Sequence, residues 1–149
     1  VAKKEFHVRG RILHHPQFKT PNQRAQFQVR PLPRPRQEHY PFLLATIRSE
    51  GQFNSIIYEP TDSYRHGAER DSVLIGKQDM DAMGLKNGDR VSLQSPTGSM
   101  NNVKVQRFDL PAGNVLAYYP EANVLSERKV DPRSKTPNFK SIPVKVIKA

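Results

Sequence analysis

Short apolar segments separated by tight-turn signals constrain the fold of this chain more than any other feature. Turn sequences such as Asn87-Gly88 and Ser95-Pro-Thr-Gly98 interrupt the apolar pattern, and sequences of this kind favour hairpins. We therefore expect short strands over residues 73–75, 91–93, 103–105, 115–119 and 142–147. Many short strands in one domain favour a β-barrel, because closure removes the unpaired edges that an open sheet exposes. The expected fold class is mainly β.

Two further segments add a strand and a helix to this pattern. The run Phe42–Ile47 is apolar and β-prone at its end, and the turn signal Arg48-Ser-Glu-Gly51 follows it. The segment Asp79-Met-Asp-Ala-Met-Gly84 predicts a short helix, with Asp79 near its N-cap and Gly84 closing it. We expect one or two short helices beside the barrel.

The first 40 residues differ in composition from the rest of the chain. Six of the thirteen prolines lie within residues 1–41, including the run Pro31-Leu-Pro-Arg-Pro35. Such a run forms a tether more often than a polyproline II ligand for an aromatic groove. Phe27 and Val29 alternate with polar residues and predict one short strand. We expect an extended, Pro-rich N-terminal arm over residues 1–40, leading in from a preceding domain, and the barrel over residues 41–149.

The composition limits the chain to one globular domain and excludes several kinds of site. The chain has 149 residues, 36% of them hydrophobic, and no cysteine. Disulfides, thiolate zinc sites and thiol catalysis are therefore impossible in this chain. Its apolar runs are far shorter than the roughly 20 residues that cross a bilayer, so no membrane span is expected. Because the sequence begins at Val1, we expect a fragment or an excised domain.

The net charge of +10 is concentrated at the two ends of the chain. Residues 1–41 hold nine Lys and Arg against two acids, residues 42–126 hold eight against ten, and residues 127–149 hold seven against two. Segmental charge of this kind suits nucleic acid, an anionic cofactor or an acidic partner, although a solvated face is the commoner origin of a basic cluster.

An irregular basic segment precedes the last predicted strand. Between Val130 and Lys140 lie three basic side chains, two prolines and several hydroxyl or amide groups. No helix or strand period fits this segment, because each proline removes a backbone donor and biases the preceding residue toward extended geometry. A rigid backbone that carries cations and hydrogen-bond donors suits a ligand with phosphates and a base.

An ordered series of short motifs in the barrel region resembles a known family. The motifs are Asp79...Met83-Gly-Leu85, Gly88-Asp89-Arg-Val91, Ser95...Gly98, Leu110-Pro-Ala-Gly113, Tyr119-Pro and Asn123-Val-Leu125. The series is similar to the C-terminal dinucleotide-binding domain of molybdopterin oxidoreductases, and it most resembles formate dehydrogenase alpha-subunit-like proteins. The resemblance covers residues 41–149 and implies a double-psi β-barrel, as in aspartate decarboxylase, that binds molybdopterin guanine dinucleotide.

The resemblance also implies cofactor contacts at positions that match the family. Arg48 would bear charge against pyrophosphate or pterin oxygens, and Gln52 and Asn54 would supply neutral donors. In formate dehydrogenases these last two positions are often His and Ser, and both departures weaken formate as the substrate. The implied cofactor-binding residues are Thr46, Arg48, Ser49, Gln52, Phe53, Asn54, Tyr119, Asn123, Lys135, Phe139 and Lys140.

By the same resemblance, catalysis belongs to a larger protein. In the family, an earlier domain holds the molybdenum or tungsten, and electrons leave through an iron–sulfur cluster elsewhere in the parent protein. The remaining domains of the parent oxidoreductase are therefore the expected partners, and the isolated chain is expected to be inactive. None of the five histidines suggests a metal site, because the adjacent pair His14-His15 would point to opposite faces of a strand. We expect a cytoplasmic location, with the periplasm as the alternative.

Two other functions compete with this interpretation. A basic β-barrel that binds nucleic acid would account for the net charge, but the aromatic residues form no repeated stacking row. A barrel that acts alone as an aspartate-decarboxylase-like enzyme would need a self-processing Gly-Ser bond. Gly98-Ser99 is the only such dipeptide, and the pattern places it in a hairpin turn.

Overall fold

The computed structural model describes residues 10, 16–31, 39–49, 52, 61–62 and 65–148. The chain divides into two compact units, Val1–Pro33 and Arg34–Ala149, and each is described by itself.

The described part of the first unit contains one local turn and no regular element. The Thr20 hydroxyl donates to the Arg24 carbonyl at 2.7 Å, and the Gln23 amide donates to the Thr20 carbonyl at 2.9 Å. The strand predicted around Phe27 and Val29 is wrong, because residues 25–31 form no strand and these two side chains are 99% and 98% exposed. Alternation of apolar and polar residues produces a strand only where a neighbour accepts the backbone hydrogen bonds.

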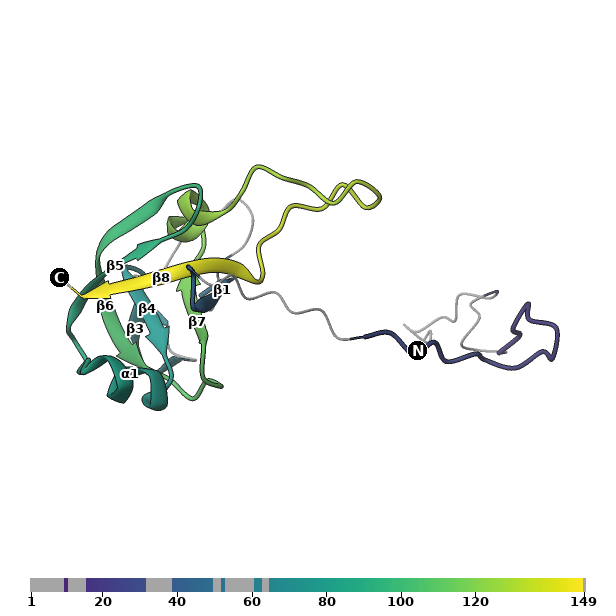
Figure 1. Ribbon diagram of the computed structural model, residues 1–149, viewed down its shortest axis with the longest axis horizontal. Coiled ribbons are helices and arrows are strands. Elements are labelled where there is room, and N and C mark those ends of the chain that lie inside the picture. The colour runs from purple at the N-terminus through teal and green to yellow at the C-terminus, as the bar shows by residue number, and fades with distance from the viewer. Residues whose placement is uncertain are drawn as a thin grey trace, which may run out of the picture. The chain divides into compact units, whose positions relative to one another are not determined.

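The second unit is built around a closed barrel, in which six strands of the described residues follow the order β1-β7-β4-β6-β5-β8 (Figure 1). Among the described residues, helix α1, the 3-10 helix η2 and a small sheet of β2 and β3 accompany the barrel. The elements are β1 (Phe42–Ile47), β2 (Thr61–Asp62), β3 (Ala68–Glu69), β4 (Ser72–Ile75), α1 (Lys77–Met83), β5 (Arg90–Gln94), β6 (Ser99–Arg107), β7 (Asn114–Tyr118), η2 (Glu121–Leu125) and β8 (Ile142–Lys148).

The barrel contains both parallel and antiparallel pairs of strands. β1 runs parallel to β7, with Leu43 opposite Asn114, and β4 runs parallel to β6. The remaining neighbours are antiparallel, and β8 closes the barrel by pairing with both β1 and β5. Because β1 and β7 run in the same direction, their C-terminal ends lie together at one end of the barrel. The segments that leave these two strands are therefore neighbours in space.

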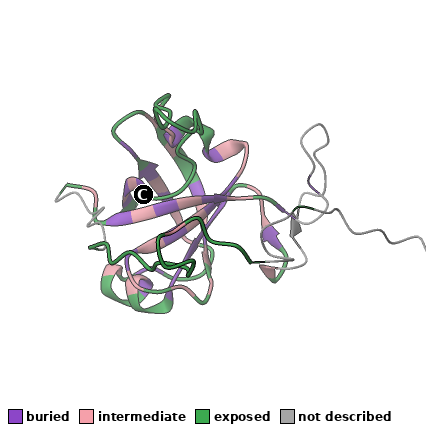
Figure 2. Cartoon of the chain, turned by 90° about the vertical axis from the view of Figure 1, so that its right-hand side faces the viewer, coloured by how far each residue is buried: buried purple, intermediate pink, exposed green. Residues whose placement is uncertain are grey.

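Aliphatic side chains on alternate strand positions fill the barrel interior. Figure 2 shows which parts of the strands are buried. β1 shows the strict alternation of buried and half-buried residues that a strand with one inward face requires. Burial of these residues removes apolar surface from water and provides the main stabilisation of the fold. Each barrel strand contributes at least one side chain with no exposed surface, namely Leu44, Val73, Val91, Val105, Val115 and Val144.

Helix α1 spans seven residues and ends where it was predicted to end. Gly84 adopts the left-handed conformation, with a φ of 61°, that closes many helices. Its start differs from the prediction, because the N-cap is Gly76 and Asp79 lies within the first turn. The Asp79 carboxylate instead accepts a hydrogen bond of 2.8 Å from the Gly113 amide and so ties the helix to the turn before β7. Asp81 pairs with Lys77 rather than serving the helix start.

The β5–β6 hairpin brings its tip against η2. The Ser95 amide donates to the Gly98 carbonyl at 2.9 Å, as the predicted turn requires. A Cβ atom added at Gly98 would lie 2.1 Å from the Val124 carbonyl oxygen, so only glycine fits there without movement of η2. The Thr97 hydroxyl donates to the Leu125 carbonyl at 3.0 Å, which holds the end of η2 on the hairpin.

These observations confirm the predicted fold class, a mainly β barrel with short helices. Every strand predicted within residues 42–148 is present, and five of the six lie within one residue of their expected bounds. The strand expected over residues 103–105 is longer than predicted, because β6 starts four residues earlier and ends two residues later. The double-psi connectivity, the extended character of the arm and the boundary at residue 40 stay predictions.

Candidate functional site

Three segments that carry predicted site residues converge at one end of the barrel. One segment follows β1, one follows β7, and one precedes β8. In the β1–β7 pair, Ile47 lies opposite Tyr118, so the chain leaves both strands at the same level. β8 runs antiparallel to β1 from Ile142, opposite Leu44, which places the residues before β8 beside the end of β1. Parallel pairing of two distant strands thus assembles the site.

Thr46, Phe139 and Lys140 join the last of these segments to β1. The Thr46 amide and hydroxyl both donate to the Phe139 carbonyl, at 3.1 and 3.2 Å. The Lys140 ammonium donates to the Thr46 carbonyl. Thr46 is only 6% exposed, so its polar atoms anchor the segment, whereas the 38% exposed ring of Phe139 faces outward. The predicted site residues of this group are therefore together, but Thr46 has a structural role.

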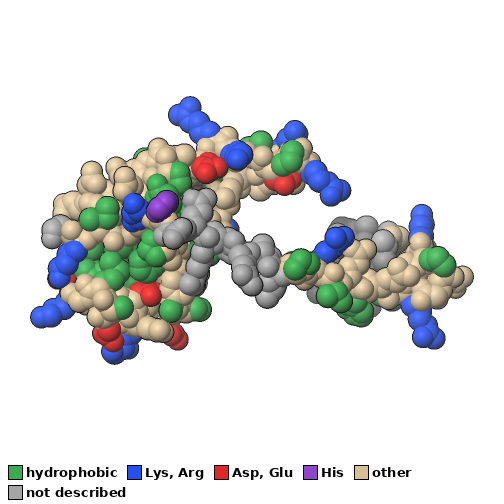
Figure 3. Space-filling view, viewed as in Figure 1, with side chains coloured by type: hydrophobic (Ala, Val, Ile, Leu, Met, Phe, Trp, Pro, Cys, Tyr) green, Lys and Arg blue, Asp and Glu red, His purple; other side chains and the backbone are tan. Residues whose placement is uncertain are grey.

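The segment from residue 127 to residue 140 leaves the barrel as an exposed irregular loop (Figure 1). Its Lys and Arg side chains stand out along the loop in the space-filling view (Figure 3). A turn built on Asp131 organises its tip, because one carboxylate oxygen accepts from the amides of Arg133 and Ser134 at 3.0 and 2.7 Å. These hydrogen bonds, chiefly those of Ser134, hold the pKa of Asp131 below its ordinary value.

The remainder of that turn fixes Lys135. The Lys135 amide donates to the Asp131 carbonyl at 2.9 Å, and the residue has a φ of 57°. The Asp131 amide donates to the Thr136 carbonyl at 3.0 Å, and a bridge joins Val130 to Pro137. The loop is thus irregular but hydrogen-bonded, and it presents the Lys135 side chain to solvent.

Arg48 and Tyr119 lie against each other where β1 and β7 end. The Arg48 guanidinium carbon stands 5.4 Å from the centre of the Tyr119 ring, which is the geometry of a cation–π contact. Arg48 is exposed, and its carbonyl accepts a hydrogen bond of 3.1 Å from Arg65. The contact places an exposed cation beside the Tyr119 ring where the two strands end.

Ser49 and Gln52 are buried and hold the segment after β1 in place. The Gln52 amide oxygen accepts from the Ser49 backbone N–H at 3.2 Å, and its amide nitrogen donates to the Tyr119 carbonyl at 2.9 Å. The Gln52 backbone N–H donates to the Ser49 carbonyl at 3.2 Å. Both residues were predicted to bind the cofactor, and those contacts stay predictions; within the chain, their polar groups bind each other and the Tyr119 carbonyl. Phe53 and Asn54 lie outside the described residues.

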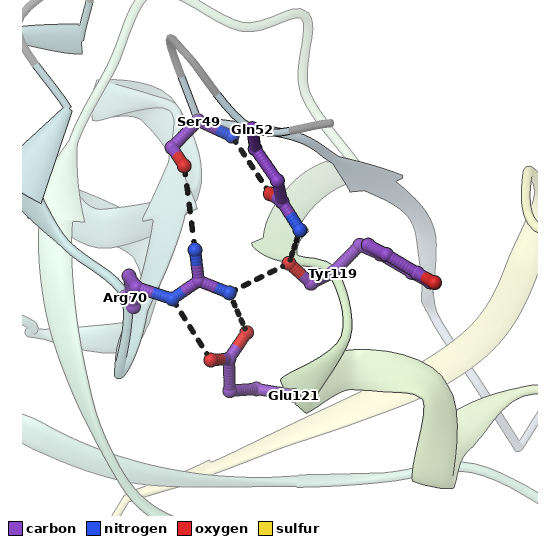
Figure 4. Close-up of polar contacts among 5 residues, drawn as sticks. All are labelled: Ser49, Gln52, Arg70, Tyr119 and Glu121. Atoms are coloured by element: carbon purple, nitrogen blue, oxygen red, sulfur yellow. Dashed lines mark hydrogen bonds and ion pairs between the residues drawn. The ribbon is translucent and has the colours of Figure 1, made fainter. Parts of the chain in front are cut away.

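A largely buried arginine that the sequence analysis did not single out connects these segments (Figure 4). Arg70 forms a bidentate ion pair with Glu121, with Nε to Oε1 at 2.9 Å and Nη2 to Oε2 at 3.0 Å. It also donates to the Tyr119 carbonyl at 2.9 Å and to the Ser49 hydroxyl at 3.3 Å. The side chain is 13% exposed, and that of Glu121 is 35% exposed.

Asn123 lies on η2, the 3-10 helix that follows β7. Its backbone N–H donates to the Pro120 carbonyl at 2.9 Å, and its carbonyl accepts from the Ser126 amide at 3.1 Å. The residue is exposed. A helix in this position fixes the backbone of Asn123 and leaves its side-chain amide able to both donate and accept.

Among the described residues, no group of three or more His, Cys, Asp or Glu comes close enough to hold a metal ion. No helix in the described ranges is long and apolar enough to cross a membrane.

Comparison with known proteins places this geometry in a family. Residues 42–143 match the family model described as Molydopterin dinucleotide binding domain. The barrel also matches the structure of acetylene hydratase from Pelobacter acetylenicus, with a TM-score of 0.56, 19% sequence identity, and coverage of 74% of this chain and 19% of that one. At this identity the likeness concerns the fold alone.

Three curated relatives agree with the family match. Protein YdeP of Escherichia coli K12 is 34% identical over 113 residues, and the uncharacterized oxidoreductase Rv2900c of Mycobacterium tuberculosis is 36% identical over 120 residues. The assimilatory nitrate reductase of Haloferax mediterranei is 30% identical over 137 residues. These matches cover 70%, 73% and 87% of this chain, but only 15%, 15% and 19% of the relatives. The chain therefore belongs to the Molydopterin dinucleotide binding domain family of molybdopterin oxidoreductases, whose cofactor is a molybdopterin dinucleotide.

Proposed function

We propose that this chain binds the dinucleotide with the segments after β1, after β7 and before β8, and that the form it binds is molybdopterin guanine dinucleotide. The observation that carries the proposal is the convergence of Arg48, Asn123 and Lys140 at the end of the barrel where the parallel strands β1 and β7 finish. Lys135 and Phe139 belong to the loop that leads into this end, and Tyr119 supports Arg48.

The donor groups at this end fit an anionic dinucleotide. Arg48 and Lys140 are exposed cations on rigid backbone, and a guanidinium can donate two parallel hydrogen bonds to a phosphate. The Lys140 ammonium uses one of its three donors on the Thr46 carbonyl and keeps two for a ligand. The exposed Asn123 amide matches the mixed donor and acceptor edge of a purine or a pterin.

In this proposal, the buried residues among the predicted cofactor contacts support the exposed ones. Thr46, Ser49 and Gln52 are 6%, 5% and 7% exposed, and each is hydrogen-bonded within the site. Residues that lock one another hold the exposed donors in a productive geometry before the ligand arrives, which lowers the entropy lost on binding. Phe53 and Asn54 are proposed as contacts on the family resemblance alone.

The chain supplies binding and orientation, and the chemistry belongs to the protein that contains it. When bound, the cofactor would provide molybdenum or tungsten, held by other domains, as the centre of an oxidation–reduction. We propose a formate-dehydrogenase-like oxidoreductase as the parent, supported by the sequence resemblance of residues 41–149. The remaining domains of that protein are the proposed partners, and an iron–sulfur cluster in one of them is the proposed electron carrier.

The test uses the intact protein that contains this chain, purified with its cofactor. Arg48→Gln, Asn123→Ala and Lys140→Ala are expected to reduce the pterin and the molybdenum or tungsten per polypeptide. The matched control is Lys86→Ala, since Lys86 is an exposed cation in the turn before β5, at the opposite end of that strand from η2. Wild-type pterin content in all three site variants would contradict the site, and wild-type protein without pterin would contradict the cofactor.

The salt dependence of binding distinguishes a nucleic-acid-binding function from the cofactor site. Binding through phosphates weakens steeply as salt rises, because each neutralised phosphate releases counterions. Titration of a labelled single-stranded oligonucleotide at 50 and about 200 mM salt measures this slope. Tight binding with a steep slope, unaffected by guanine nucleotides, would favour the alternative over the cofactor site.

A further inference from the structure

We propose that Arg70 is a positioning residue for the dinucleotide site, an inference that rests on the proposed function. Arg70 lies in the short turn between β3 and β4, a segment that carries none of the predicted cofactor residues. Its guanidinium nevertheless contacts the segment after β1, the backbone at the end of β7 and the first residue of η2 (Figure 4). We call Arg70 and its partners Ser49, Gln52, Tyr119 and Glu121 the Arg70 cluster.

All three guanidinium nitrogens donate hydrogen bonds, and among the described residues they share three partners. Nε and Nη2 form the fork that meets both carboxylate oxygens of Glu121, Nη2 also donates to the Tyr119 carbonyl, and Nη1 donates to the Ser49 hydroxyl. Because the guanidinium is planar, these directions are fixed relative to one another. The Tyr119 amide donates to the Ile47 carbonyl at 2.8 Å, and past that bond the Arg70 side chain joins the segment after β1 to the start of η2.

The Tyr119 carbonyl links Arg70 to the residues proposed to bind the ligand. It accepts from both Arg70 and Gln52, each at 2.9 Å. These two hydrogen bonds hold the Tyr119 backbone and so restrict the position of its ring. The Arg48 guanidinium carbon lies 5.4 Å from the centre of that ring. The same contacts fix Glu121, two residues before Asn123 on η2.

The burial of Arg70 explains why the cluster needs a carboxylate. A guanidinium with a 13% exposed side chain has lost most of its water, and its charge is compensated by the bidentate pair with Glu121. Removal of Glu121 would take this carboxylate away from a cation that has lost most of its water. The pair thus couples η2 to the turn before β4 and holds both in one arrangement. Arg70 acts on the ligand through Tyr119, Ser49 and η2.

The experiment compares Arg70→Gln and Glu121→Gln with Arg90→Gln in the intact, cofactor-loaded protein. Arg90 also pairs with a carboxylate, Asp71, at 2.6 Å, but it contacts none of the three converging segments through that pair. The measurements are the rate of pterin release after dilution and the midpoint of thermal unfolding. We expect release to become about tenfold faster in Arg70→Gln, a change of about 1.4 kcal/mol in binding, a smaller increase in Glu121→Gln, and no change in Arg90→Gln.

A charge-exchanged variant distinguishes positioning from simple stabilisation. Arg70→Glu combined with Glu121→Arg restores an ion pair, but it removes the residue-70 donors to Tyr119 and Ser49. We expect its unfolding midpoint to recover relative to Arg70→Glu alone, while its pterin release stays fast. Release at the wild-type rate in the exchanged variant would overturn the positioning role.

The outcomes also separate this inference from the function on which it rests. Wild-type release from Arg70→Gln, together with pterin loss in Arg48→Gln, would overturn only the role of Arg70. Absence of pterin from the wild-type protein would overturn the cofactor assignment and this inference with it.

Discussion

Replacement of Gly98 by alanine tests whether η2 packs closely against the β5–β6 hairpin. In the native packing, the added Cβ would lie 2.1 Å from the Val124 carbonyl oxygen and 3.1 Å from its carbon. A carbon and an oxygen without a hydrogen bond stay more than about 3 Å apart, so η2 must move by about 1 Å. The contacted oxygen and carbon belong to the Val124 backbone, so no flexible side chain can turn away to relieve the contact.

The expected cost follows from two contributions. Overpacking of a tight contact costs about 1–3 kcal/mol. A shift of η2 also breaks the hydrogen bond from the Thr97 hydroxyl to the Leu125 carbonyl, which contributes about 0.5–1.5 kcal/mol. We expect Gly98→Ala to lower the free energy of unfolding by about 1.5–4.5 kcal/mol and the unfolding midpoint by about 6–18 °C, since 1 kcal/mol corresponds to about 4 °C at this size.

The assay is denaturant and thermal unfolding of the 149-residue chain, followed by circular dichroism. The matched control is Ser99→Ala, because Ser99 is the exposed neighbour of Gly98 at the start of β6. The control is expected to stay within about 0.5 kcal/mol of the wild type. A Gly98→Ala protein as stable as the control would refute the close packing of η2 on the hairpin and, with it, the placement of Asn123.

Three further changes have outcomes that the structure specifies. Leu44→Ala removes a side chain with no exposed surface from the barrel core and should lower the free energy of unfolding by about 2–5 kcal/mol; a loss below about 1 kcal/mol in denaturant titration would contradict its packing. Ser72→Ala removes a buried hydroxyl that has no hydrogen-bond partner, so stability should stay equal or rise by up to about 1 kcal/mol, and a clear loss would reveal an unrecognised partner. The lowered pKa of Asp131 means that its turn is stabilised above the ordinary carboxyl pKa and loses that stabilisation as pH falls through the lowered value. The Ser134 amide shift, followed by NMR during acid titration, should report that transition, and Asp131→Asn should abolish it.

The barrel was predictable from local signals because its strands are short, apolar and bounded by turn residues. The helix end at Gly84 and the Ser95–Gly98 turn are formed by residues close together in the sequence. Local sequence patterns are therefore enough to predict them. The strand predicted at Phe27 and Val29 failed because alternation does not reveal whether a partner strand exists. The start of α1 was misplaced because Asp79 is used in a contact with Gly113, 34 residues away.

The candidate site was predictable only in part, and the reason is the sequence separation of its contacts. Family motifs indicated Arg48, Tyr119 and Asn123, which the structure places on neighbouring segments. Arg70 stands between two acids in a turn, a pattern typical of a solvated surface, and its partner Glu121 is 51 residues away. Nothing local distinguishes such an arginine from an exposed one. The contacts of all eleven site residues with the cofactor, and the cytoplasmic location, stay predictions.

The strand order of the barrel has a consequence for how the domain folds during synthesis. Among the described residues, strand β1 pairs with β7 and β8, with Leu43 opposite Asn114 and Phe42 opposite Val144. Until those residues have been made, β1 exposes two unpaired edges and an apolar face to the cell. Pairing across such distances in sequence is slow, because the intervening loop must be closed before any contact compensates for it. The nascent chain should therefore depend on chaperones until β8 emerges, and a ribosome stalled before residue 142 should present an aggregation-prone intermediate.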